Sequence, residues 1–118
     1  MGDRALVLFK DARCVSPTVY LHWDGNAVPT LVEQLGILMN GRHNDASYAA
    51  ARFIGIVHEH TPGSLSLGVV DTPDEISDAV RDADEAILAR YSHGDAGVVV
   101  VDTSDFSWKA FGGYLEDC

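Results

Sequence analysis

Gly97-Val-Val-Val-Val-Asp102 (GVVVVD) is the stretch that decides the fold. It is short and has no polar residue between its two ends, which favours a strand covered on both faces. A strand covered on both faces lies in the middle of a sheet rather than at its edge. We therefore expect residues 97–102 to form a central strand.

Other apolar segments supply its neighbours. Residues 106–110 alternate apolar and polar side chains and follow a Thr103-Ser-Asp105 turn, so they are expected to pair with the central strand. Residues 5–9 (ALVLF) and 18–23 (TVYLHW) are joined by a loop and predict an antiparallel hairpin. Residues 65–70 alternate in a similar way and predict a fifth strand.

Three segments have the patterns of helices. Apolar residues at helical spacing predict helices over residues 27–40 and about 45–58, the second of them capped by Asn44. Thr72-Pro-Asp-Glu75 has the pattern of a capping box, with Thr at the N-cap and Pro at the first helical position. It predicts a third, continuous helix over residues 73–91.

The predicted elements follow the order ββααβαββ, which is typical of a single α+β domain over residues 1–118. We expect a mixed, mostly antiparallel sheet with the helices on one side. No linker or low-complexity segment divides the chain. The longest apolar runs are too short for a membrane-spanning helix, and residues 1–12 lack a signal-peptide pattern, so a cytoplasmic protein is expected.

The net charge of −10 is unevenly spread along the chain. Residues 1–70 contain six acidic and five basic residues, whereas residues 71–118 contain twelve acidic and three basic ones. A protein that binds nucleic acid directly carries the opposite sign, so direct binding is not expected. The acidic half instead indicates a basic partner or a strongly solvated surface, and a compositional bias toward Asp is the competing explanation.

Many of these acidic residues lie in the predicted helix over residues 73–91. Asp74, Asp78 and Asp82 follow one another at four-residue intervals, and Glu85 continues the row. Like charges at this spacing destabilise a helix by roughly a few tenths of a kcal/mol per pair, so local stability does not select the row. Carboxylates about 6 Å apart along a helix resemble the phosphate spacing of a nucleic acid. These four residues are the predicted contacts with a partner, and a solvated face is the alternative.

Tyr20-Leu-His-Trp-Asp-Gly-Asn26 (YLHWDGN) is the most unusual stretch of the chain. On a strand, His22 and Asp24 share one face, while Trp23 points to the other and is expected to anchor the core. An imidazole beside a carboxylate suits a general base or a metal site, and a site joining His22, Asp24 and His58 is the alternative functional prediction. Strand-end and turn chemistry explains the same residues without a site, and we favour this interpretation.

Signatures of common enzyme classes are missing from the sequence, which has no GxSxG, HExxH, Walker A or GxGxxG motif. Cys14 and Cys118 form neither a CxxC pair nor a zinc spacing, and both are expected to be reduced thiols. No catalytic residue and no cofactor are therefore predicted, and an enzyme is disfavoured.

Tyr20-Leu-His-Trp-Asp-Gly25, placed after a short N-terminal strand and before an apolar helix, resembles a set of small uncharacterised phage and bacterial proteins. These proteins share a Tyr-x-His-Trp-Asp-Gly signature at the same place, and the similarity covers roughly the N-terminal third of the chain. They often have Tyr-Pro after the Gly, whereas Asn26-Ala27 follows it here. The resemblance implies no known activity. It does imply a mobile-element origin, in which small acidic proteins that block host defence complexes are a familiar class.

Together these features predict a small, acidic, non-catalytic protein-binding module. Its expected partner is a basic or nucleic-acid-binding host protein, whose nucleic-acid groove the acidic helix occupies in the manner of a phage-type inhibitor. Two alternatives stay open. One is a metal-binding protein or metal-dependent hydrolase that uses His22, Asp24 and His58, and the other is a structural subunit that self-associates as a homodimer.

Overall fold

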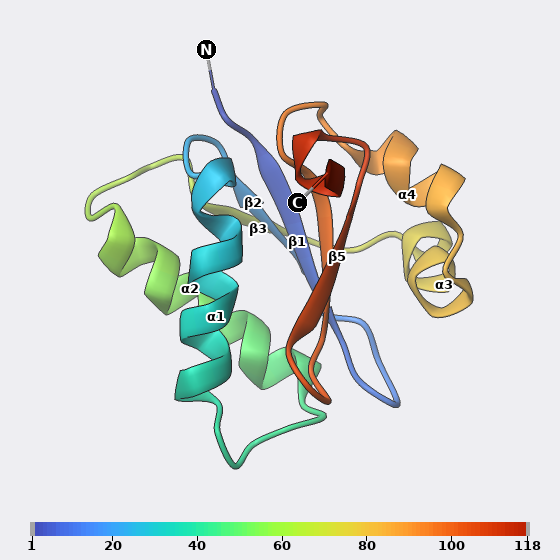
Figure 1. The fold of residues 1–118 in the computed structure, drawn as a ribbon, viewed down its shortest axis with the longest axis horizontal. Coiled ribbons are helices and arrows are strands. Elements are labelled where there is room, and N and C mark those ends of the chain that lie inside the picture. The colour runs from blue at the N-terminus through green and yellow to red at the C-terminus, as the bar shows by residue number, and fades with distance from the viewer. Residues whose placement is uncertain (1, 118) are drawn as a thin grey trace.

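The computed structural model describes residues 2–117 and is organised around a five-stranded sheet (Figure 1). Its strands are β1 (Ala5–Lys10), β2 (Thr18–Leu21), β3 (Gly68–Val70), β4 (Gly97–Asp102) and β5 (Ser107–Phe111). They lie side by side in the order β3-β2-β1-β4-β5; β1 and β4 run parallel, and the other neighbours run antiparallel. The predicted mixed, mostly antiparallel sheet is confirmed. Cys118 lies outside the described residues.

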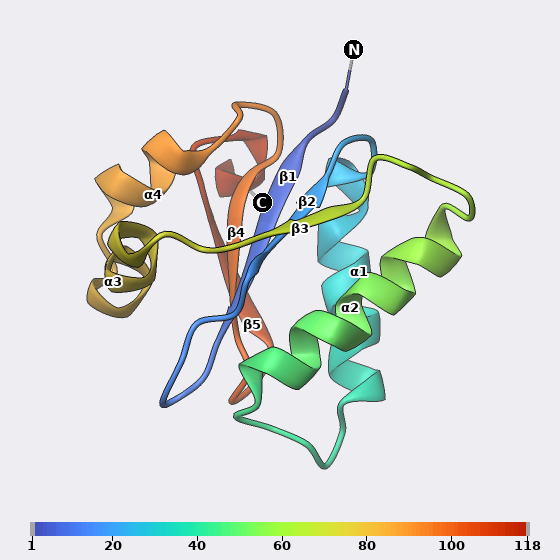
Figure 2. The same cartoon turned by 180° about the vertical axis from the view of Figure 1, so that it is seen from behind.

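Four α-helices within the described residues cover both faces of the sheet. They are α1 (Val28–Leu38), α2 (Ala46–His60), α3 (Asp74–Asp82) and α4 (Glu85–Tyr91), with short 3-10 turns η1 (Gly25–Ala27) before α1 and η2 (Tyr114–Asp117) after β5. Figures 1 and 2 show α1 and α2 on one side of the sheet and α3 and α4 on the other. The expected arrangement with all helices on one side is therefore wrong. None of these helices is long and apolar enough to cross a membrane.

The central strands explain why both faces are covered. Side chains alternate along a strand, so Val99 and Val101 face the α1–α2 layer while Val98 and Val100 face the α3–α4 layer. All four are buried, and GVVVVD is a central strand, as its sequence predicts. A strand of this kind needs a helical layer on each face, which the one-sided arrangement does not provide.

The α1–α2 layer holds the larger of the two cores. Leu31 and Leu35 of α1 and Phe53 of α2 are almost completely buried against the sheet. The rings of Phe53 and Phe9 meet edge to face with their centroids 5.3 Å apart. Such an aromatic pair adds about 0.5–1.5 kcal/mol beyond the burial of its surface. This layer therefore supplies most of the apolar packing.

The carboxylate of Asp11, in the connection between β1 and β2, holds the start of α2. It accepts a hydrogen bond from the backbone N–H of Ala46, the first residue of α2, at 2.8 Å. The N–H groups of Arg13 and Cys14 also donate to it, both at 2.7 Å. Burial raises the pKa of Asp11, but these N–H groups outweigh burial and lower the pKa to about 2. The ionised carboxylate is thus part of the folded structure.

Two predicted helix caps differ from the structure. The cap of α2 is Asp45, whose side chain accepts a first-turn N–H, rather than Asn44, which has a left-handed φ of 59°. The predicted capping box at Thr72 does not form, because Pro73 takes the N-cap position and no side chain caps α3. The hydroxyl of Thr72 donates instead to the carbonyl of Ser16 at 2.8 Å. This hydrogen bond fastens the segment before α3 to the segment before β2.

The predicted helix over residues 73–91 is two helices. α3 ends at Asp82, and its C-cap Ala83 has a left-handed φ of 54°. The side chain of Asp84 then caps α4 by accepting a first-turn N–H at 3.3 Å. A continuous helix would turn Leu88 about 80° away from Val80, because eight residues exceed two full turns. The break lets both side chains reach the sheet, where each is buried.

Candidate functional site

The YLHWDGN stretch leaves the sheet earlier than its sequence predicts. β2 ends at Leu21, so His22 and Trp23 lie in a bend, where the strand alternation has stopped. Trp23 is 50% exposed, and the prediction that it anchors the core is wrong. Its ring packs edge to face on His22 with the centroids 4.5 Å apart. Nδ1 of His22 lies 2.7 Å from the hydroxyl of Tyr20.

The predicted metal ligands His22, Asp24 and His58 line one cavity of about 10 Å³, which is space for roughly one water molecule. Asp24 is engaged elsewhere, because its Oδ2 accepts a hydrogen bond from the hydroxyl of Thr61 at 2.7 Å and its Oδ1 lies 4.0 Å from Nε2 of His60. Within residues 2–117 no group of three His, Cys, Asp or Glu side chains is placed to hold a metal ion. The metal-site alternative therefore gains no ligand set from the structure.

Three of the four predicted partner contacts lie on the outer side of α3. Together with one neighbour they form a set of exposed carboxylates that we call the α3 acidic face: Asp74, Glu75, Asp78 and Asp82. The opposite side of the helix packs Ile76, Ala79 and Val80 against the sheet. No ion pair or side-chain hydrogen bond within residues 2–117 involves the α3 acidic face. Arg81 is exposed on the same side of α3, but its guanidinium donates to the carbonyl of Arg13 and pairs with none of the four acids.

Glu85, the fourth predicted contact, is not part of this face. The break at Ala83 separates it from Asp82, so it begins a different helix. Its carboxylate lies 3.5 Å from Nζ of Lys109 on β5, in an exposed ion pair. The predicted row therefore ends with α3, and Glu85 borders a groove instead.

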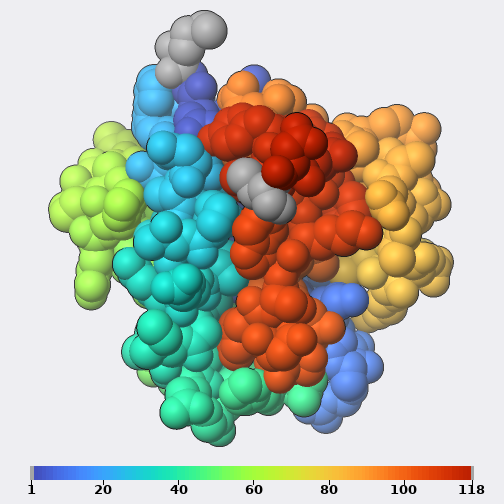
Figure 3. Space-filling view, viewed as in Figure 1, coloured from blue at the N-terminus to red at the C-terminus, as the bar shows by residue number. Residues whose placement is uncertain are grey.

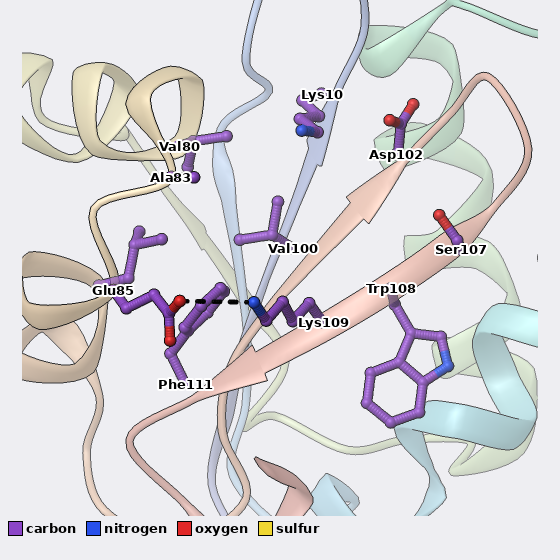
Figure 4. Close-up of a pocket in the computed structure, with 11 residues that line it drawn as sticks. Lys10, Val80, Ala83, Glu85, Val100, Asp102, Ser107, Trp108, Lys109 and Phe111 are labelled. Carbon is purple, nitrogen blue, oxygen red and sulfur yellow. Dashed lines mark hydrogen bonds and ion pairs between the residues drawn. The ribbon is translucent and has the colours of Figure 1, made fainter.

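This groove lies between the α3–α4 layer and the sheet, and no local pattern of the sequence predicts it. Its volume is about 350 Å³, which is within the range of small-molecule sites. Figure 3 shows the surfaces of β5 and of the α3–α4 layer side by side, and Figure 4 shows the side chains that line the groove. Six apolar side chains contribute to the lining: Val80, Ala83, Leu88, Val100, Trp108 and Phe111.

The sheet register arranges the other lining side chains in rows. Lys10 of β1, Asp102 of β4 and Ser107 of β5 are register partners at one end of the groove. Two residues back along β4, Val100 lies opposite Lys109 of β5. These side chains point to the α3–α4 face because residues two apart on a strand share a face. The groove thus passes from a polar end to an apolar floor.

The groove contains both lysines of the chain, Lys10 and Lys109. Lys109 pairs with Glu85, and its Nζ also lies 5.6 Å from the ring centroid of Phe111. Lys10 has no ion pair and no side-chain hydrogen bond within the described residues. The ammonium group of Lys109 is therefore paired with a carboxylate, whereas that of Lys10 is unpaired among the described residues.

Asp102 does not neutralise Lys10, although the two residues are register partners on neighbouring strands. No oxygen of Asp102 lies within ion-pair distance of the lysine among the described contacts. Its Oδ1 instead accepts hydrogen bonds from the backbone N–H of Ser104 at 3.0 Å and from the Ser104 hydroxyl at 2.7 Å. Lys10 therefore presents an unpaired cation to the groove.

Comparisons of the chain with protein-family models, with curated proteins and with solved structures each found no match. A function is therefore inferred from the residues and geometry of this chain. Two features of the surface carry such an inference, namely the α3 acidic face and the groove that contains both lysines.

Proposed function

We propose that this protein is a small, non-catalytic protein-binding module that docks on a basic partner through the α3 acidic face. One observation carries the proposal: four exposed carboxylates share the outer side of one helix, and no cation of the described residues pairs with them. The apolar side of α3 is used for the core, so its outer side is free to contact another molecule.

The electrostatics of α3 support a role in binding rather than in stability. Asp74 and Glu75 lie in the first turn, where the helix dipole favours an acid. Asp82 lies in the last turn, where the dipole favours a cation, and Asp78 repels both Asp74 and Asp82 at four-residue spacing. A basic partner relieves this repulsion, so the same carboxylates that weaken the isolated helix strengthen a complex.

The expected partner is a nucleic-acid-binding host protein. The carboxylates of Asp74, Asp78 and Asp82 follow one another about 6 Å apart along the helix axis, a spacing comparable with that of successive phosphates. A groove that holds a nucleic-acid backbone therefore accepts this helix as a substitute. The resemblance of Tyr20-Leu-His-Trp-Asp-Gly25 to small phage and bacterial proteins supports an inhibitor of the phage type.

A capture experiment tests the proposal. The protein is immobilised, and nuclease-treated bacterial lysate is passed over it at about 0.05 M and about 0.5 M salt, because the higher concentration shortens the Debye length to a few Å. We expect a nucleic-acid-binding protein to be retained at low salt and released at high salt. The variant Asp78→Lys/Asp82→Lys should lower its retention by at least roughly tenfold, because opposed charges at an interface become like charges.

The matched control reverses two exposed acids of the other layer, Glu33→Lys on α1 and Glu59→Lys on α2. It changes the net charge by the same amount and should retain the partner. Equal losses in both variants would show that only the overall charge matters. Unchanged retention by Asp78→Lys/Asp82→Lys would overturn the proposal.

A further inference from the structure

We propose that the groove between the α3–α4 layer and the sheet binds a small aromatic monocarboxylate, with its ring over Val100 and its carboxylate at Lys10 (Figure 4). The proposal concerns a second surface and does not rest on the α3 acidic face. It follows from three properties of the groove: its place in the sheet, its apolar floor and its unpaired cation.

One end of the groove lies at the carboxyl ends of the two parallel strands. Lys10 and Asp102 are the last residues of the parallel strands β1 and β4. From these ends the chain turns in opposite directions, from β1 toward β2 and from β4 toward β5. The groove opens at this position.

The floor of the groove suits a flat apolar group. Val100 is the most accessible of the four valines of β4, and Leu88 and Phe111 lie beside it in the same core cluster. Figure 4 shows Val100 between the α3–α4 junction and β5, with Phe111 toward the other end from Lys10. A volume of about 350 Å³ accommodates one ring or two fused rings. An aromatic ring therefore gains apolar contact on the floor and from the side.

The charges at the rim select a single negative charge on the ligand. Lys10 is unpaired, and its ammonium group is a compact, strongly hydrated donor that suits an exposed carboxylate. Glu85 already pairs with Lys109, and Asp102 accepts two hydrogen bonds from Ser104. The rim therefore has one unpaired cation, Lys10, and two carboxylates that already have partners, Glu85 and Asp102.

This balance disfavours three other ligand classes. A phosphate dianion would bring a second negative charge toward Glu85 and Asp102, in a protein whose net charge is −10. A neutral aromatic would leave the ammonium group of Lys10 without a partner. An aromatic amine would place a cation against Lys10 and Lys109. The monocarboxylate is the class that matches both the floor and the rim.

The test is a titration of the ¹⁵N-labelled protein with 2-naphthoate, followed by two-dimensional NMR. We expect amide shifts to change around Val100, Lys109 and Leu88, and not on the α1–α2 layer. 2-Naphthylmethanol, 2-naphthyl phosphate and 2-naphthylmethylamine, which differ only in the polar group, should each bind more weakly. Lys10→Gln should weaken 2-naphthoate binding roughly fivefold to tenfold, from the loss of one charge-assisted hydrogen bond at a partly exposed site.

Two further variants separate the groove from a general charge effect. Lys109→Gln should weaken binding only about twofold to threefold, because Glu85 already shares this cation. Arg90→Gln, which removes an exposed cation of α4 outside the groove, should leave the affinity unchanged. Shifts outside the groove, equal affinity for the neutral alcohol, or no effect of Lys10→Gln in a folded variant would overturn the proposal. The α3 carboxylates are intact in all three variants, so failure here leaves the proposed protein-binding function untouched.

Discussion

The two helical layers that share the central strands differ in size and in charge. On one face, α1 and α2 have 11 and 15 residues and enclose Phe53 and Leu35. On the other, α3 and α4 have 9 and 7 residues, pack fewer apolar side chains and leave a groove against the sheet. The α3–α4 layer also carries the unpaired acids. We infer that the α1–α2 layer contributes most of the folding stability, whereas the α3–α4 layer carries the candidate binding surfaces.

The largest loss of stability is expected from a truncation in the core of the α1–α2 layer. Phe53→Ala removes a ring that is fully buried and in edge-to-face contact with Phe9, so it should lower the free energy of unfolding by about 3–5 kcal/mol. Urea unfolding followed by circular dichroism measures this change. Ile76→Ala is the matched truncation in α3, where the side chain retains some exposure, and should cost about 2–3 kcal/mol. A larger loss for Ile76→Ala than for Phe53→Ala would reverse the comparison.

An intermediate effect concerns Asp11, which ties the β1–β2 connection to α2. Asp11→Asn keeps one acceptor oxygen but places an amide against a donating N–H group, and it should cost about 1–2 kcal/mol at pH 7. Glu33→Gln, an exposed change on α1 without a side-chain partner among the described residues, should cost almost nothing. Urea unfolding at pH 7 compares the two variants.

The same residue predicts a pH dependence. The pKa of Asp11 is lowered from its ordinary value of 3.8 to about 2 on folding, so the unfolded chain takes up the proton first as the pH falls. Its contribution to stability is complete above about pH 4 and is lost as the pH falls toward 2. The difference in stability between wild type and Asp11→Asn should therefore shrink over this range. A difference that stays constant between pH 4 and pH 2 would contradict the assignment.

The smallest expected change in stability tests the left-handed conformation that separates α3 from α4. Ala83 has a φ of 54°, a left-handed conformation that disfavours a side chain and favours glycine at the end of a helix. Ala83→Gly should raise the melting temperature and stabilise the fold by about 1 kcal/mol. Ala51→Gly, at an exposed position inside α2, should instead destabilise it by about 0.5–1 kcal/mol. If both variants were destabilised alike, the break at Ala83 would be in doubt.

The sequence is most informative where burial determines the pattern. GVVVVD predicts a central strand because only a strand covered on both faces tolerates an unbroken apolar run, and the structure confirms it. The helices over residues 27–40 and 45–58 were likewise predicted from apolar spacing, and α1 and α2 agree with them within a few residues at each end. These predictions rest on contacts with a core, which the residue pattern records.

The errors arise where a tertiary contact overrides a local preference. Nothing between Asp82 and Asp84 breaks a helix by propensity, and Ala83 takes its left-handed conformation so that Leu88 can reach the sheet. Thr72 has the pattern of a cap, but the nearby carbonyl of Ser16 takes its hydrogen bond. Such competing partners are distant in sequence and cannot be read from a local motif.

Of the two candidate sites, the one formed within a single helix was predicted from the sequence, and the one formed between distant strands was not. The exposed carboxylates of α3 were predicted because they lie within one helix, where spacing alone defines a face. The groove was missed because Lys10 and Lys109 come from opposite ends of the sequence and meet only through the pairing of β1, β4 and β5. The scarcity of lysine was the one signal in the sequence, and it does not say where the two side chains lie.

The parallel pairing of β1 with β4 has a consequence for biosynthesis. Ala5 pairs with Gly97, so most of the chain, including α1 to α4, lies between the partners of the central pair. While the ribosome is still making the intervening segments, β2 is the only strand partner that β1 can have. Contacts this distant in sequence slow folding and prolong the exposure of apolar edges. The nascent chain therefore completes its sheet only after β4 and β5 have emerged, and until then one edge of β1 has no strand partner.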